Sequence, residues 1–234
     1  MSNPFFHFKK FTVYHNLCAM KVGTDAVLLG AWSNHTSARW ILDVGTGSGV
    51  IALMLSQRFS DAKVDAIDID EGAYQQACIN FNNSPFKDRL KAFNESFLEF
   101  SPQYKYDLIV SNPPYFNNSL LSPNHSRTLA RHTTELNLNT LIEKAKSLLN
   151  DKGILALVLP YSSLETTVDI ANDNGLHLVR SLSVKPMENR PPKRVLLEFS
   201  NSFGEQINKE LVLELSRHNY SLEYKALTKD FMLD

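Results

Sequence analysis

A short motif, SNPPY at residues 111 to 115, directly follows the apolar run YDLIV and has the residue types needed to handle an amino group. The side-chain oxygen of Asn112 can accept one N–H bond. The carbonyl of Pro113 can accept a second, because Pro114 biases it towards an extended backbone, and Tyr115 offers a flat face for stacking. The motif therefore predicts a catalytic site for a planar, conjugated NH2 group. The simpler alternative is a strand that ends in prolines beside a buried tyrosine.

A glycine-rich segment, DVGTGSGV at residues 43 to 50, has the composition of a ligand-binding turn between a strand and a helix. Gly45, Gly47 and Gly49 let the backbone turn sharply and let a ligand approach closely. The third glycine comes one residue early for the dinucleotide fingerprint, which argues against a nicotinamide cofactor. Asp68, about 20 residues further on, stands where a carboxylate meets the two hydroxyls of a ribose. The combination predicts an adenosine-containing ligand, and the alternative is a tight turn with Asp68 as a helix cap.

The order of the apolar runs predicts the elements that position these motifs. Short apolar runs alternate with helical patterns, which is typical of a parallel sheet with crossover helices in an α/β fold. The last two runs are joined by a long, proline-rich segment, so we expect them to form an antiparallel pair. Strands are expected at residues 39–45, 63–70, 89–96, 106–112, 153–160, 176–184 and 194–200, and helices at 50–59, 71–82, 136–150 and 163–174. The run 210–215 is expected to add an edge strand, followed by a terminal helix within 221–232.

Composition narrows the class of protein. The chain has 234 residues, 43% of them hydrophobic, which is enough for one globular unit. Its 24 basic and 25 acidic residues nearly cancel, so any nucleic acid must bind a local basic patch. Cys18 and Cys78 lie far apart with no matching histidine pair, so neither a metal site nor a disulfide is expected. No run resembles a signal peptide or a membrane span, and we expect a cytoplasmic monomer without a membrane partner.

The glycine segment and Asp68 together resemble the S-adenosylmethionine-dependent methyltransferases of the class I, Rossmann-like fold. That fold has a seven-stranded mixed sheet with helices on both faces and an antiparallel C-terminal hairpin. The resemblance covers about residues 38 to 200 and implies S-adenosyl-L-methionine as cofactor. It assigns to the cofactor Asp43, Gly45, Thr46, Gly47, Gly49, Asp68, Ile69 and Asn112, with Glu95 or Ser96 at the adenine.

SNPPY resembles the [DNS]-P-P-[YFW] motif of amino methyltransferases, which act on adenine N6 or on the amide of glutamine. The leader FHFKKFTVYHNLCAMKVGTDAVLLGAW, with SNPPYF, ARHTTELNLNTLI and PPKRVLLEF, closely resembles the bacterial tRNA(Val) adenine N6-methyltransferase family. This second resemblance implies tRNA as partner, a valine isoacceptor, and the adenosine immediately 3′ of the anticodon as target. Two alternatives stay open: a protein-glutamine N5-methyltransferase, disfavoured by the short leader, and a non-catalytic S-adenosylmethionine-binding RNA assembly factor.

The family resemblance also divides the chain. Residues 1–37 are expected to form an N-terminal extension that covers the cofactor and the substrate mouth, and residues 38–234 the methyltransferase domain. Lys21, Thr24 and Asp25 are then candidates for contacts near the methionine moiety of the cofactor. The alternative for Thr24 and Asp25 is an ordinary N-cap of the helix AVLLGAW.

Three basic clusters are candidates for binding RNA, which needs basic and aromatic surface. Each cluster alone could also be an ordinary solvated face. The clusters are Phe8, Lys9, Lys10 and Phe11 in the leader, Arg127, Arg131 and His132 beyond SNPPY, and Lys185, Arg190, Lys193 and Arg194 near the proline-rich segment.

Overall fold

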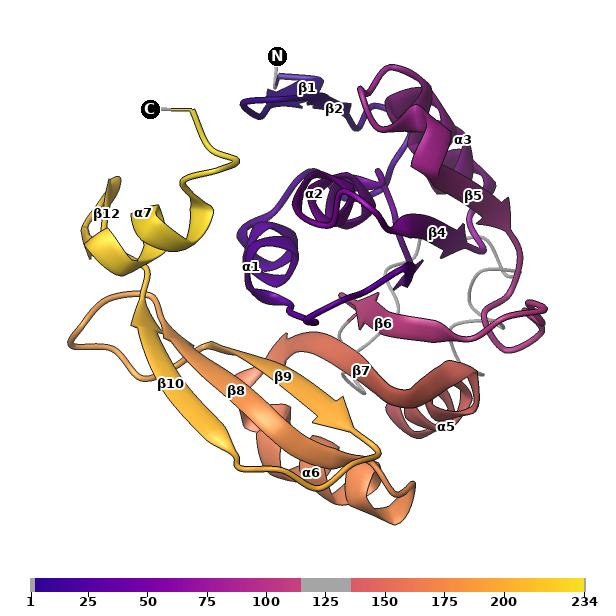
Figure 1. Ribbon diagram of the computed structural model, residues 1–234. Helices are drawn as coiled ribbons and strands as arrows, with labels where there is room; N and C mark the ends of the chain where they lie inside the picture. The colour runs from indigo at the N-terminus through magenta and orange to yellow at the C-terminus, as the bar shows by residue number, and fades with distance from the viewer. Residues whose placement is uncertain (1–2, 115–135, 234) are drawn as a thin grey trace, which may run out of the picture.

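The computed structural model describes residues 3–114 and 136–233, and eight strands within these ranges form one central sheet (Figure 1). Along the sheet the strands lie in the order β10-β8-β9-β7-β6-β3-β4-β5. Their bounds are β3 Trp40–Val44, β4 Lys63–Asp68, β5 Leu90–Asn94, β6 Tyr106–Ser111, β7 Leu149–Pro160, β8 His177–Lys185, β9 Arg194–Ser200 and β10 Ile207–Val212. The strands predicted from the apolar runs are all present.

Strand direction follows the predicted α/β pattern. β3 pairs in parallel with β4 and β6, and β6 pairs in parallel with β7. β9 is antiparallel to both β7 and β8, which confirms the predicted C-terminal hairpin. β10 pairs in parallel with β8 at the edge, so the sheet has one strand more than the seven that the class I resemblance implies. This extra strand is the edge strand expected from residues 210–215, although it begins earlier, at Ile207.

Helices cover both faces of the sheet (Figure 1). Side chains of β7 alternate between two cores, with Ala156 and Val158 in one and Leu155 and Leu157 in the other. The first core takes side chains of α1 Thr24–Trp32, α2 Val50–Arg58, α3 Glu71–Asn82 and α7 Leu222–Thr228, and the second takes those of α5 Leu138–Leu148 and α6 Leu164–Asp173. None of these described helices combines the length and the apolar character that a membrane crossing requires.

Short elements connect or extend these layers. The sequence did not predict the leader hairpin, in which β1 pairs antiparallel with β2. The short elements are β1 Phe5–His7, β2 Thr12–Tyr14, η1 Lys87–Arg89, η2 Tyr161–Ser163, β11 Glu214–Ser216 and β12 Asn219–Tyr220.

The leader is part of the first core. Phe8 and Phe11 are buried, at 4% and 6% exposure, and their rings stack with centroids 4.6 Å apart. The expectation that these two phenylalanines offer aromatic surface to RNA is therefore wrong, because both rings pack inward.

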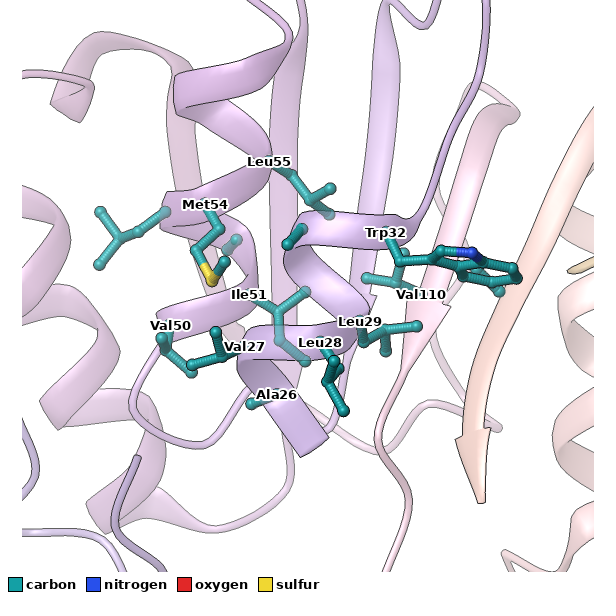
Figure 2. Packing of buried hydrophobic residues seen from close by; sticks show 14 of the residues in the cluster. Ala26, Val27, Leu28, Leu29, Trp32, Val50, Ile51, Met54, Leu55 and Val110 are labelled. Atoms are coloured by element: carbon teal, nitrogen blue, oxygen red, sulfur yellow. The ribbon is translucent and has the colours of Figure 1, made fainter. Parts of the chain in front are cut away.

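α1 packs against α2 at a close crossing. Figure 2 shows side chains of both helices and Val110 of β6 gathered in one cluster. Gly30 lies at the contact, where a β-carbon would come within 2.8 Å of the Met54 sulfur. A glycine at this position lets the helix backbones approach, and Met54 fills the space that remains.

The end of α1 is bound to the C-terminal hairpin by a buried charge network. Arg180 of β8 forms a two-point ion pair with Glu198 of β9, with N–O distances of 2.6 and 2.7 Å. Arg180 also donates to the Trp32 carbonyl at 2.7 Å, and Glu198 accepts from the backbone N–H of Asn34 at 2.8 Å. The guanidinium lies 4.0 Å from the Trp32 ring centroid. These contacts fix where α1 ends relative to two strands that come late in the chain.

Candidate active site

The predicted site residues meet at one edge of the sheet. In the parallel ladders Val44 of β3 lies beside Ile67 of β4 and Ser111 of β6, so these strands end at the same level. Ligands of open α/β sheets bind at this edge. The Ser111 hydroxyl donates to the Val44 carbonyl at 2.9 Å, which fixes the start of the Asn112 motif against the start of the glycine loop.

The carboxylates of Asp43 and Asp68 both form hydrogen bonds with the glycine loop. Gly45, Gly47 and Gly49 all have positive φ angles, of 69°, 55° and 80°, which L side chains rarely adopt. The Asp43 carboxylate accepts from the Thr46 hydroxyl at 2.6 Å and from the Ala52 backbone N–H at 3.1 Å. The loop therefore has a fixed shape that follows from its own sequence.

Asp68 holds the other side of the same loop. Its side chain accepts from the backbone N–H of Gly47 at 2.8 Å and from that of Asp70 at 3.0 Å. Burial raises the pKa of the Asp68 carboxyl, and the two N–H bonds oppose that shift. Asp70, in contrast, caps α3 by accepting from Ala73 at 2.8 Å, so the helix-cap alternative for Asp68 is wrong.

Asp43 lies on the side of the glycine loop that faces the protein interior. It is fully buried, and desolvation raises the pKa of its carboxyl to about 7. Of the residues in the glycine segment, Gly45 and Gly47 line the cavity described next, whereas Asp43, Thr46 and Gly49 do not. Gly49 packs inward, because a β-carbon there would meet the Phe81 ring at 2.5 Å. The contacts that Asp43, Thr46 and Gly49 are predicted to make with the ligand stay a prediction.

A cavity of about 320 Å³ opens above the glycine loop. Asp68 and Ile69 line it at the end of β4, and Glu95 and Ser96 at the end of β5. Its remaining lining is mostly apolar and comprises Cys18, Ala19, Met20, Val44, Gly45, Gly47, Ile67, Asp70, Ala73, Phe97, Asn112, Pro114 and Leu136. An apolar slot with a carboxylate at one side fits a planar base joined to a ribose.

A second cavity, of about 740 Å³, lies beside the first. Its lining carries the positive charge of Lys21, Lys193 and Arg194, together with Asp25. The other residues that line it are Met20, Gly23, Thr24, Ala26, Leu28, Asn112, Pro113, Pro114 and Leu213. Lys21, Thr24 and Asp25 thus line this larger cavity, and their contacts near the methionine moiety stay a prediction.

Asn112 lies where the two cavities adjoin. Asn112, Pro114 and Met20 line both of them, while the buried Pro113 lines only the larger one. A group that enters the larger cavity can therefore reach the side chain of Asn112 from one side, and a ligand of the smaller cavity from the other. This is the arrangement that transfer between two bound molecules requires.

Comparison with known proteins identifies the chemistry. The family model of the methyltransferase small domain matches residues 18–168. Proteins named tRNA1(Val) (adenine(37)-N6)-methyltransferase from Parabacteroides distasonis and Phocaeicola vulgatus are 50% and 46% identical to this chain, respectively. The match covers all of this chain in both cases, and 99% and 100% of the two relatives. This chain belongs to the tRNA1(Val) (adenine(37)-N6)-methyltransferase family. It is an S-adenosylmethionine-dependent methyltransferase.

Solved structures agree with this fold. A predicted O-methyltransferase from Agrobacterium tumefaciens superposes with a TM-score of 0.70 at 16% identity, covering 88% of this chain and 96% of that one. A ribosomal protein L11 methylase from Lactobacillus delbrueckii subsp. bulgaricus gives a TM-score of 0.54 at 21% identity, covering 76% and 78%. At such identities the likeness concerns the Rossmann-like methyltransferase fold alone.

An ion pair closes one side of the methyltransferase's larger cavity. The Arg194 guanidinium at the start of β9 donates to the Asp25 carboxylate of α1 at 2.9 Å. Thr24 and Asp25 are the first residues of α1, whose N-cap is Gly23 and has no side-chain cap bond. The N-cap alternative for Thr24 and Asp25 is therefore wrong, because Asp25 is engaged by a residue from the far end of the chain.

The remaining residues predicted to bind RNA differ in their hydrogen-bond and ion-pair partners. The Lys9 ammonium donates to the Lys229 carbonyl at 2.9 Å, whereas Lys10 is exposed. Lys185 pairs with Glu210 at 2.8 Å across β8 and β10. Tyr115, Arg127, Arg131 and His132 lie outside the described residues.

Sequence reasoning missed part of the cofactor cavity. The leader residues Cys18, Ala19 and Met20 line it, and so does Phe97 two residues beyond Glu95. Burial and the nearby Asp68 and Asp70 raise the pKa of the Cys18 thiol to about 11, so it stays protonated at neutral pH. The available signals were the family resemblance, which places residues 1–37 over the cofactor, and the position of this stretch directly before Lys21. Among the described residues, no cluster of three or more His, Cys, Asp or Glu side chains could hold a metal ion.

Proposed function

We propose that this methyltransferase transfers a methyl group from S-adenosylmethionine to N6 of adenosine 37, the nucleotide immediately 3′ of the anticodon, in a valine tRNA. One observation carries the proposal: Asn112 lies between a small, mostly apolar cavity with an acidic side and a larger cavity lined by basic side chains. The names of relatives at 42 to 50% identity support this choice of substrate.

In this proposal the smaller cavity takes the cofactor. The Asp68 carboxylate binds the ribose hydroxyls through charge-assisted hydrogen bonds. Glu95 or Ser96 binds the amino edge of the cofactor adenine, with Ile69 and Phe97 against its faces. When bound there, S-adenosylmethionine supplies an electrophilic methyl group. The glycine loop holds the ligand through its fixed shape, because the backbone N–H groups of Gly45, Thr46, Gly47 and Gly49 are bonded within the protein.

Asn112 and Pro113 prepare the nucleophile. The Asn112 side-chain oxygen and the Pro113 carbonyl each accept one N–H of the target amine, which favours a pyramidal nitrogen with an available lone pair. Pro113 and Pro114 carry no backbone N–H that would compete for these acceptors. Tyr115 stacks on the target base in this proposal. Catalysis then rests on position and hydrogen bonding, and the amine proton leaves to water after transfer.

The larger cavity takes the RNA. Lys21, Lys193 and Arg194 place positive charge around it, which suits the phosphates on either side of a nucleotide turned out of the stack. Lys9, Lys10, Arg127, Arg131 and His132 are proposed to extend this surface. The leader, residues 1–37, contributes to both sites, because Cys18 to Lys21 run along the boundary of the two cavities.

Methyl transfer from labelled S-adenosylmethionine to unmodified valine tRNA, followed by nucleoside mass spectrometry, tests the proposal. We expect N6-methyladenosine at position 37, and no label when the tRNA carries guanosine there. Label in a release-factor protein but not in tRNA would instead support protein-glutamine methylation. Tight tRNA binding without any methylated base at saturating cofactor would support a non-catalytic assembly factor.

A further inference from the structure

Two buried amide side chains on α3 face the leader. Gln76 and Asn80 are one helical turn apart and only 1% and 0% exposed. They lie on the same face as the buried Ala73, Ala77 and Phe81, where the helical pattern would otherwise place apolar residues. Polar groups this deeply buried need hydrogen-bond partners, so their bonds explain why they are there.

Asn80 joins two separate segments. Its side-chain oxygen accepts from the backbone N–H of Tyr14 at 2.9 Å. Its side-chain nitrogen donates to the Tyr14 carbonyl at 2.8 Å and to the Ser48 carbonyl at 2.7 Å. Tyr14 is the last residue of β2 in the leader, and Ser48 belongs to the glycine loop.

Gln76 holds the leader alone. Its side-chain oxygen accepts from the backbone N–H of Leu17 at 3.0 Å, a contact with the leader and not with the glycine loop. Nearby, a β-carbon at Gly72 would come within 2.8 Å of the Leu17 carbonyl, so the leader backbone lies directly on the start of α3. Gln76 and Asn80 therefore form a natural pair for comparison.

Both segments that Asn80 joins belong to the cofactor cavity. Gly45 and Gly47 of the loop line one part of it, and Cys18, Ala19 and Met20 of the leader line another. Asp43 and Asp68 hold the loop from β3 and β4, but the hydrogen bonds of these two carboxylates go to residues 46 to 52 and to residue 70. Among these three side chains, only Asn80 bonds both the loop and the leader.

We propose that Asn80 is a positioning residue that sets cofactor affinity by holding the leader and the glycine loop in one fixed relation. It does not line the cavity and touches no reacting atom. The inference rests on the cofactor half of the proposed function and is independent of which RNA is methylated.

Asn80→Leu is the main test, because leucine has the same branched shape, with larger methyl groups, and cannot make any of the three bonds. We expect the Kd for S-adenosylhomocysteine, measured by calorimetry without RNA, to rise about tenfold or more. Trypsin cleavage after the exposed Lys21, followed by mass spectrometry of the fragment that begins at Val22, should become faster. At saturating cofactor and tRNA, kcat should stay within about threefold of the unmodified enzyme, so that the defect appears in the KM for the cofactor.

Two variants serve as controls. Asn82→Leu makes the same change at an exposed position of the same helix and should leave both readouts unchanged. Gln76→Leu should speed cleavage after Lys21 while weakening cofactor binding less than Asn80→Leu does. If Asn80→Leu fails to fold, Asn80→Ser is used instead, since serine is too short to reach the Ser48 carbonyl.

The proposal is overturned if a folded Asn80 variant binds S-adenosylhomocysteine as tightly as Asn82→Leu does. Faster cleavage with unchanged affinity would also overturn it, since the leader would then be held without any effect on the cofactor. A failure of tRNA methylation with the expected change in S-adenosylhomocysteine affinity would reject the proposed RNA substrate and leave this inference standing.

Discussion

The two cavities that meet at Asn112 are built in different ways. The smaller one is lined almost entirely by residues from the first half of the chain, at the ends of β3, β4, β5 and β6 and in the leader at Cys18 to Met20. The larger one joins Lys21 to Asp25 of the leader and α1 with Lys193 and Arg194 at the start of β9. Its rim depends on an ion pair, between Asp25 and Arg194, whose partners are separated by 169 residues.

This difference matches the two tasks. The cofactor is one small molecule, and the glycine loop beside it is held by bonds from neighbouring elements in the first half of the chain, to Asp43, Asp68 and Asn80. The RNA partner is large and varies between enzymes, and it is met by segments that the fold brings together from both ends of the chain. Variants in the lining of the smaller cavity should therefore change cofactor affinity, and variants in the lining of the larger cavity should change tRNA binding. Asn112 lines both cavities.

Asn112→Ala should have the largest effect. Loss of one acceptor for the target amine is expected to lower kcat about 100-fold or more, because the interaction is strongest in the transition state. The Kd for S-adenosylhomocysteine should change less than about threefold, since Asn112 is one of many lining residues. Asn201→Ala, in an exposed turn, is the control. Near-normal turnover in the Asn112 variant would show that this side chain takes no part in the reaction, although it lines both cavities.

Asp68→Ala should damage the cofactor side alone. Loss of charge-assisted bonds to a ribose is expected to weaken S-adenosylhomocysteine binding about 30-fold, as measured by calorimetry. Asp61→Ala, at an exposed turn that lines neither cavity, is the matched control and should leave this affinity unchanged. An Asp68 variant that binds S-adenosylhomocysteine as tightly as Asp61→Ala does would remove the Asp68 carboxylate from the proposed cofactor site.

Arg194→Gln should damage the RNA side alone. We expect the KM for tRNA to rise about tenfold. The slope of log K for tRNA binding against log salt concentration should fall by about one, which corresponds to the loss of one phosphate contact. The Kd for S-adenosylhomocysteine should not change. Arg217→Gln removes the same charge from the β11–β12 connection, which lines neither cavity, and should leave all three quantities unaltered. A change in cofactor affinity with Arg194→Gln would show that the two cavities do not act independently.

The last test concerns protein stability, through the support beneath the glycine loop. The pKa of Asp43 is raised from 3.8 to about 7 in the folded protein, so the folded state binds this proton more tightly than the unfolded state. The stabilising contribution is complete below about pH 4 and is lost as the pH rises to 7, by at most about 1.4 kcal/mol per pH unit. Urea unfolding at several pH values should show this slope in the wild type and a reduced slope in Asp43→Asn. Identical slopes would mean that Asp43 ionises normally when folded.

Local patterns accounted for most of the fold and for the cofactor half of the site. α3 occupies residues 71 to 82 as predicted, and the glycine loop follows β3 directly, because both depend on periodicity and on backbone freedom within a few residues. The reversed β9 was also predictable, since the proline-rich connection could not form a crossover helix.

The features that the sequence did not predict depend on distant partners. β1 and β2 are three residues each, too short for a periodic pattern, and they form where the leader meets α3. Thr24 and Asp25 look like a helix cap, but Arg194 determines where the Asp25 carboxylate lies. Asn80 carries no motif, and only its position on an otherwise apolar helical face distinguishes it.

The attachment of α1 has a consequence for how the protein is made. Asp25, near one end of this helix, is bound by Arg194, and Trp32 and Asn34, at its other end, are bound by Arg180 and Glu198. A ribosome makes the helix first and these strand residues last, and contacts between distant residues form slowly. We therefore expect a nascent chain to complete most of the smaller cavity while α1, already packed on α2, still lacks its contacts with β8 and β9, an order that ribosome-arrested chains of increasing length would test. The substrate-binding half of the enzyme is then the last to mature.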